Sequence, residues 1–122
     1  MPDCSLPRTE RLRSLGAVRR MFESGESGFI FPFRYVWFAE ADEIPSAEVL
    51  FSVPKKFHKR ANKRNLLCRR TKEAYRLQKL LLHNGRPVNL DLALIYSSKE
   101  ELSYKTISNA VRRILETVAE HL

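Results

Sequence analysis

The sequence lacks the features that mark secreted, membrane-spanning and disulfide-rich proteins. Its first residues, Met1 to Ser5, carry neither the basic flank nor the apolar run of a signal peptide. No apolar run is long enough for a transmembrane helix. The two cysteines, Cys4 and Cys68, are too few for a disulfide framework or a cysteine-rich zinc site. These absences predict a cytoplasmic protein with no membrane partner.

Side chains that could form a protein-only active site are also scarce. The three histidines, His58, His83 and His121, fall at expected loop or helix ends and have no partner four residues away, so they indicate neither a zinc site nor a nucleophile's base. Carboxylates cluster between Glu40 and Glu43, where a short polar connection more often carries solvated turn residues than metal ligands. An unaided nuclease is therefore not expected.

Acidic residues are nearly absent from one segment of the chain. Lys55 to Lys79 contains eleven Lys and Arg but a single acid, Glu73, which gives this segment a charge of +10 in a chain of net charge +8. A solvated helix face usually mixes charges of both signs, because like charges repel. A concentrated positive potential attracts polyanions and releases their counterions on binding. Nucleic acid is therefore the expected partner.

The remaining composition indicates one folded domain. The chain has 122 residues, of which 43% are hydrophobic and 30% charged, a balance typical of a globular protein with one core. We expect residues 1–7 to form a flexible leader and residues 8–122 to form a single RNA-binding domain.

Hydrophobic periodicity predicts strands interleaved with helices. Period-two patterns predict strands over residues 29–38, 49–53 and 88–96, with a turn at 39–46 between two antiparallel strands. Helical patterns cover residues 8–24, 60–82 and the segment after Ser103, where Ile107, Val111, Ile114, Leu115 and Val118 form the expected buried stripe. This order predicts an α+β fold, a single-domain α-β sandwich in which three helices pack on one small sheet.

The basic helix is predicted to be amphipathic. One polar arc at helical spacing contains Asn65, Arg69, Lys72, Arg76 and Lys79. The opposite side, predicted to pack on the sheet, contains Leu66, Leu67, Ala74, Leu77 and Leu81. The helix should therefore present its cations to solvent, where arginine forks can bind phosphate.

An aromatic stripe precedes the basic segment and has two possible roles. Alternation places Phe29, Phe31, Phe33, Tyr35 and Trp37 on one face of a single predicted strand. Such rings can stack on unpaired RNA bases, or they can form the core face of the sheet. The core role is favoured for most of them, with one or two rings left open to a ligand.

The basic segment also carries a specific motif. From Lys55 the chain reads KKFHKRANKRNLLCRRTKEAYR, which closely resembles the signature of the bacterial ribonuclease P protein component. The resemblance implies an α-β sandwich with a left-handed crossover of the basic helix between two parallel strands. It also implies a protein subunit of an endoribonuclease that removes the 5′ leader of precursor tRNA. In that family the catalytic RNA performs the hydrolysis with Mg²⁺ bound mainly through RNA and substrate.

The resemblance assigns two sets of contact residues. RNA-binding positions are Lys55, Lys56, Arg60, Arg64, Asn65, Arg69, Arg70, Lys72 and Arg76. Phe22 matches an aromatic of the cleft that holds the single-stranded leader, and Val18 stands where many members have another ring. Phe33 or Tyr35 is expected to complete that cleft. Leu66 and Cys68 replace two usual basic residues of the family.

Two other functions remain open. A non-enzymatic RNA-binding protein of the ribosome or its assembly would explain the charge equally well. A DNA-binding regulator is disfavoured, because a strand ending at Val53 and Pro54 precedes the basic helix where a helix-turn-helix would have a helix. No DNA partner is expected.

Overall fold

The computed structural model describes residues 15–41, 46–82 and 88–121. Its elements are α1 (Leu15–Ser24), β1 (Glu26–Ile30), β2 (Phe33–Ala41), β3 (Ser46–Ser52), α2 (Ala61–Gln78), the short 3-10 helix η2 (Lys79–Leu82), β4 (Val88–Tyr96) and α3 (Tyr104–His121). The predicted leader and parts of the predicted first helix, acidic turn and helix stop lie outside the described residues. None of the described helices is long and apolar enough to cross a membrane.

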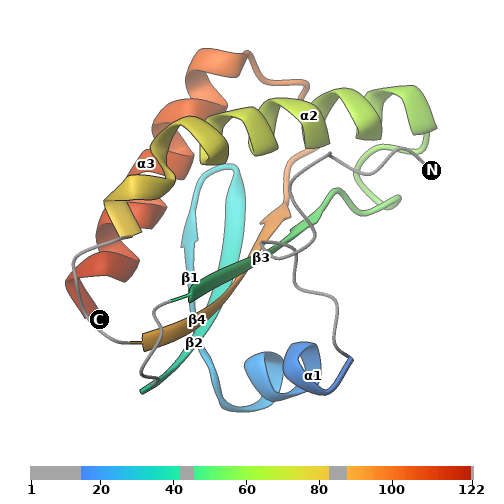
Figure 1. The fold of residues 1–122 in the computed structure, drawn as a ribbon. Coiled ribbons are helices and arrows are strands. Elements are labelled where there is room, and N and C mark those ends of the chain that lie inside the picture. The colour runs from blue at the N-terminus through green and yellow to red at the C-terminus, as the bar shows by residue number, and fades with distance from the viewer. Residues whose placement is uncertain (1–14, 42–45, 83–87, 122) are drawn as a thin grey trace.

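The strands form one mixed sheet in the order β1-β2-β4-β3. Strand β2 runs antiparallel to both β1 and β4, whereas β3 runs parallel to β4. Figure 1 shows α2 and α3 on one side of the sheet and α1 alone on the other. The three-helix α-β sandwich predicted from the sequence is therefore confirmed.

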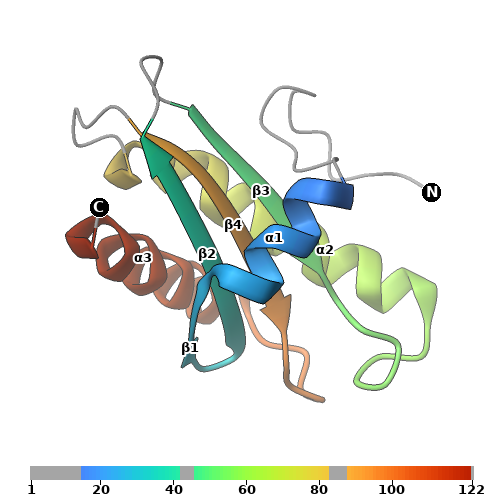
Figure 2. The same ribbon diagram turned by 90° about the horizontal axis from the view of Figure 1, so that it is seen from below.

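The connection from β3 through α2 to β4 is left-handed. Figure 2 shows the sheet from the side of α1, with β3 and β4 running downward and β4 to the left of β3. Seen instead from the side of α2, with both strands running upward, β4 also lies to the left of β3. Parallel crossovers are right-handed in nearly all proteins, so this connection is unusual. It agrees with the handedness that the resemblance implies.

The single strand predicted over residues 29–38 is wrong. The segment forms a hairpin, in which Ile30 pairs with Phe33 and the residues between them, Phe31 and Pro32, form the turn. Proline has no N–H to donate to a strand ladder, so Pro32 ends one strand before the next begins. The strand β1 is the element that the sequence interpretation missed.

The hairpin divides the aromatic stripe. Phe29 and Phe31 are exposed, whereas Phe33 and Tyr35 are buried in the core beneath α2 and α3. The Phe33 ring packs edge-on against Tyr96 with 5.6 Å between ring centroids. The core role is therefore confirmed for the rings of β2 that face α2 and α3.

A smaller apolar cluster lies beneath α1. Met21 of α1 is completely buried against Val36 of β2 and Ala93 of β4, with Val18 partly buried beside them. The helix ends where Gly25 N–H donates to the Met21 carbonyl at 2.8 Å. A Cβ at Gly25 would collide with the carbonyl oxygens of Met21 and Trp37, so only glycine allows the chain to turn so close to β2.

The buried face of α2 differs from the predicted one. Its apolar stripe contains Leu67, Ala74 and Tyr75, with Tyr75 packed edge-on against Phe51 of β3 at 5.8 Å between ring centroids. Leu77 is 61% exposed and Leu81 is also exposed, so their predicted packing on the sheet is wrong. The large Tyr75 ring sets the rotation of the helix, because burying it removes more apolar area than burying a leucine.

The last predicted elements agree closely with the structure. Strand β4 has the predicted bounds, and all five residues of the predicted stripe on α3 are buried. The predicted turn at 39–46 is partly wrong, because residues 39–41 continue β2 and residue 46 begins β3. These two strands run in opposite directions but are not neighbours, since β4 lies between them.

Candidate nucleic-acid interface

The basic segment forms a loop after β3 and then the whole of α2. The residues predicted to contact RNA, eight cations and Asn65, have three degrees of burial. Lys55, Lys56, Arg60, Arg69 and Arg76 are exposed, Arg64, Asn65 and Arg70 are partly buried, and Lys72 is buried. The exposed group follows the loop and the outward side of α2, as predicted, and can approach a polyanion without burying uncompensated charge.

Two of the partly buried arginines are held by backbone carbonyls. Arg64 Nη1 donates to the carbonyls of His58 at 3.2 Å and Lys59 at 2.8 Å. Arg70 Nη1 donates to the Leu102 carbonyl at 2.6 Å. A guanidinium has five N–H donors, so each arginine keeps others for a phosphate while its orientation is set in advance.

Near the end of α2, a carboxylate compensates the charge of one cation. Arg76 Nε donates to Glu73 Oε2 at 3.0 Å, and a second contact joins Arg76 Nη2 to Glu73 Oε1. The hydrogen bonds and positive charge of Arg76 hold the pKa of the Glu73 carboxyl below its usual range. The attraction of Arg76 for phosphate is therefore reduced by the neighbouring carboxylate of Glu73.

The expected outward position of Lys72 is wrong. Only 7% of this residue is exposed, because it lies beside Thr71 and Leu67 on the part of α2 that packs inward. Leu66 and Cys68, which replace usual basic residues of the family, are both partly buried. The contact surface is therefore narrower than the sequence predicted.

The face of the sheet beneath α1 is a second candidate surface. Cross-strand pairing places Phe29, Arg34, Ile95 and Ser52 in one row across the four strands, at the end nearest the β1–β2 turn. Phe29 is 58% exposed, Arg34 is exposed, and Ile95 and Ser52 are partly buried. In Figure 2, α1 crosses the middle of the sheet away from this row, which we call the open row.

The expected leader residues are distributed between the two faces. Val18 is partly buried on the side of α1 that packs on the sheet, whereas Phe22 is 47% exposed on the same helix. Phe33 and Tyr35 are buried on the opposite face, so the prediction that they line a cleft beneath α1 is wrong. The error arises because successive residues of a strand point to opposite faces of the sheet, and Phe33 and Tyr35 are on the face away from α1.

The open row contains Arg34, which the sequence interpretation missed, and Phe29, which it named only as one ring of the aromatic stripe. Phe29 and Arg34 are direct partners across β1 and β2, so their side chains share the face beneath α1. Pro32 was the available signal, because a proline between two apolar runs predicts a break and therefore a hairpin.

The other end of the same face is acidic. Asp91 pairs across the sheet with Phe38 on one side and Glu48 on the other. Asp91 is only 4% exposed, and this burial together with the charge of Glu48 raises the pKa of its carboxyl. Arg20 of α1 offsets part of this effect and forms an ion pair with Glu40 at 3.2 Å. The open row therefore carries the positive charge of Arg34, whereas the other end carries carboxylates that would repel phosphate.

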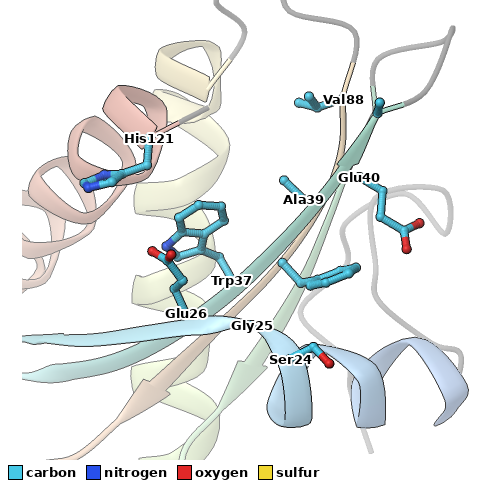
Figure 3. A pocket seen from close by; sticks show the side chains of 10 residues that line it. Ser24, Gly25, Glu26, Trp37, Ala39, Glu40, Val88 and His121 are labelled. Atoms are coloured by element: carbon cyan, nitrogen blue, oxygen red, sulfur yellow. The ribbon is translucent and has the colours of Figure 1, made fainter.

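A pocket of about 390 Å³ lies near the free edge of β2, beyond the start of β1. Figure 3 shows Trp37 and His121 facing each other across it, and their ring centroids are 6.2 Å apart. Glu26 and Glu40 also border it. Both carboxylates oppose a polyanion, so this pocket does not extend the candidate RNA surface.

The chain contains no obvious metal centre in its described part. No group of three or more His, Cys, Asp or Glu side chains within residues 15–41, 46–82 and 88–121 is arranged to hold an ion. The donor set of these residues therefore does not fit a metal site within the protein alone.

Most of the chain matches a known protein family. Residues 6–119 match the family model described as Ribonuclease P. The chain belongs to the ribonuclease P family. A curated ribonuclease P protein component from Porphyromonas gingivalis is 30% identical over 122 residues, covering 97% of this chain and 89% of the relative. The family is that of a tRNA-processing endoribonuclease.

Solved ribonuclease P proteins share the fold. The protein from Thermotoga maritima has a TM-score of 0.71 at 21% identity, with 88% of this chain and 96% of that chain covered. The protein from Staphylococcus aureus has a TM-score of 0.72 at 20% identity, with 93% and 92% covered. The mixed sheet and three helices are therefore the architecture of ribonuclease P proteins.

Proposed function

We propose that this chain is the protein subunit of a bacterial ribonuclease P and acts in the cytoplasm. It binds the catalytic RNA and the single-stranded 5′ leader of precursor tRNA, and so promotes endonucleolytic 5′ maturation. The observation that carries this proposal is the row of exposed cations on the loop before α2 and on α2 itself, in a chain of this family.

The cationic row is proposed to bind phosphates of the RNA subunit. Lys55, Lys56 and Arg60 lie on the loop, and Arg64 and Arg69 continue the row onto α2. Each neutralised phosphate releases condensed counterions, so the affinity should fall steeply as salt rises. The backbone contacts of Arg64 reduce the entropy lost when its guanidinium meets a phosphate.

The open row is proposed to bind the leader. Phe29 offers a ring for an unpaired base, and stacking of this kind contributes about 1 to 3 kcal/mol per base. Arg34 beside it can bind the phosphate of the same nucleotide. Phe22 on α1 provides a second exposed ring near the same face. The acidic end around Glu48 and Asp91 would limit how far the leader extends beneath α1.

We assign the hydrolytic step to the RNA subunit, with Mg²⁺ bound mainly through RNA and substrate. The ion would stabilise charge on the attacking and leaving oxygens of the scissile phosphate. The protein's own part is to bind the leader and the RNA together, which fixes the substrate relative to the catalytic RNA and lowers the entropic cost of reaction.

The deciding experiment measures cleavage of a precursor tRNA at low magnesium with a bacterial ribonuclease P RNA, with and without this protein. We expect RNA-dependent cleavage at the mature 5′ end, stimulated by the protein. Cleavage by the protein without RNA would contradict the assignment of chemistry to the RNA subunit. Absence of stimulation, together with co-sedimentation with ribosomal subunits, would favour the ribosomal alternative instead.

A further inference from the structure

Two loops meet at the end of the sheet that lies next to the cationic row. The first, residues 53–60, follows β3 and carries Lys55, Lys56 and Lys59, and we call it the basic turn. The second, residues 97–103, follows β4 and we call it the closing loop. Because β3 and β4 are parallel, with Ser52 opposite Ile95, both loops begin at the same end of the sheet, where these two strands finish. Figure 2 shows both at that end.

A buried histidine joins the two loops. His58 lies in the basic turn and is only 6% exposed. Its Nε2 lies 2.8 Å from the carbonyl oxygen of Ser98 in the closing loop. A carbonyl only accepts hydrogen bonds, so Nε2 must carry the proton and donate. The imidazole also packs edge-on against Tyr96, with 5.5 Å between ring centroids.

The closing loop is in turn anchored to β4 and to α2. The Tyr96 hydroxyl donates to the Glu100 carbonyl at 2.6 Å and accepts from the Leu102 N–H at 3.2 Å. Arg70 of α2 donates to the Leu102 carbonyl. The network therefore runs from the basic turn through His58 and the closing loop to the middle of the basic helix.

The other hydrogen bonds of the basic turn join it to itself and to α2, since Arg64 Nη1 donates to the carbonyls of His58 and Lys59. Phe57 N–H and His58 N–H donate to the Pro54 carbonyl at 3.2 and 3.3 Å, which closes one local turn. The lysine side chains of the basic turn are exposed. His58 is the buried side chain that links this turn to the closing loop. Its loss would leave the Ser98 carbonyl without this donor and let the turn move relative to the closing loop, although the hydrogen bonds from Arg64 remain.

We propose that His58 is a positioning residue for RNA recognition, which fixes the basic turn against the closing loop so that Lys55, Lys56 and Lys59 meet phosphates in a preordered arrangement. This inference rests on the proposed function, because it concerns the same RNA surface. His58 itself is buried and does not contact RNA. Its contribution is to order the turn before RNA binds, so that the turn loses less conformational entropy on binding.

The test uses two substitutions that separate the donor from the ring. His58→Gln keeps an N–H donor for the Ser98 carbonyl, whereas His58→Phe keeps a ring beside Tyr96 but cannot donate. The full chain is titrated with a bacterial ribonuclease P RNA over a range of salt. We expect His58→Phe to weaken binding about fivefold to thirtyfold, the range that one or two kcal/mol produces. His58→Gln should restore most of the affinity.

The salt slope distinguishes positioning from direct contact. The number of phosphate contacts is unchanged in both variants, so the slope of log affinity against log salt should equal that of the original chain. Amide exchange of residues 55–60 should become faster in His58→Phe and not in His58→Gln. A lower slope for His58→Phe would mean that His58 binds phosphate itself, and unaltered affinity would mean that the turn needs no such anchor. Either result overturns the proposal.

Val118→Ala controls for general loss of stability. Val118 is completely buried on α3, away from both loops, so its truncation should lower the melting temperature without changing RNA affinity. Equal loss of affinity in Val118→Ala and His58→Phe would overturn the proposal.

If His58→Phe does not fold, Tyr96→Phe removes the hydroxyl that anchors the closing loop and is expected to give the same weakened binding. Failure of the original chain to bind the RNA would refute the proposed function rather than this inference.

Discussion

Truncation of Arg69 should lower both the affinity for the RNA subunit and the salt dependence of that affinity. Arg69 is exposed on α2, and no hydrogen bond or ion pair to another described residue engages its guanidinium. In Arg69→Ala the helix keeps its buried stripe of Leu67, Ala74 and Tyr75, and alanine is a strong helix former. The change therefore removes a phosphate contact with little effect on folding.

The size of the effect follows from counterion release. One lost phosphate contact should reduce the magnitude of the slope of log affinity against log salt by about 0.7 to 0.9. Between about 50 and 200 mM salt, that difference in slope amounts to roughly a threefold change in the affinity ratio of the two proteins. The ratio should therefore be largest at low salt and decline as salt rises.

Lys72→Ala is the matched control on the same helix. Lys72 carries the same charge as Arg69 but is buried, so its removal should leave the salt slope unchanged while altering thermal stability. Both variants are titrated with the ribonuclease P RNA at several salt concentrations, and their melting temperatures are measured. An unchanged slope in Arg69→Ala, or an equally reduced slope in Lys72→Ala, would refute the assignment of the outward side of α2 as the phosphate-binding surface.

Three further results are expected from other parts of the molecule. Phe29→Ala should weaken binding of precursor tRNA by the holoenzyme at least fivefold, because a lost base stack costs about 1 to 3 kcal/mol. Arg34→Ala should also weaken that binding, because it removes a phosphate contact. Both variants should leave binding of leaderless tRNA unchanged, and equal losses for both tRNAs would contradict a leader site. Asp91→Asn should raise the melting temperature by a few degrees at neutral pH, because its buried carboxyl has a raised pKa. The raised pKa means that Asp91 stabilises the fold below about pH 4 and loses this contribution as pH rises, so the gain should disappear in acid, and a gain independent of pH would refute the cause. Leu67→Ala should cost about 2 to 5 kcal/mol in unfolding free energy, whereas Leu77→Ala should cost almost nothing; similar costs would contradict the observed rotation of α2.

Elements whose pattern comes from one buried face were predictable from the sequence. The apolar stripe of α3 repeats every three or four residues, and each of its five members is buried. Strand β4 has an apolar residue at every second position from Val88 to Tyr96, and its predicted bounds are the observed ones, although Asp91 and Ala93 on its other face are buried too. The cationic segment was equally evident, since it requires only a count of charges and comparison with a known signature.

The sequence could not show which of two apolar faces of a helix or strand is buried. Aromatic residues occur on both sides of the Phe31–Pro32 turn, so alternation alone could not show that Phe29 faces solvent while Phe33 and Tyr35 face the core. Apolar residues occur on more than one side of α2, and the packing of Tyr75 against Phe51 decided which side is buried.

The sequence by itself determined the charge, the family signature and, apart from β1, the order of helices and strands, because these follow from residues that are close together along the chain. Only the tertiary structure decided which cations are exposed, which rings share a face with α1 and that His58 lies against the Ser98 carbonyl. Those features depend on contacts between residues distant in sequence, as between residues 58 and 98. Such contacts depend on how much surface each competing arrangement buries, which local patterns do not specify.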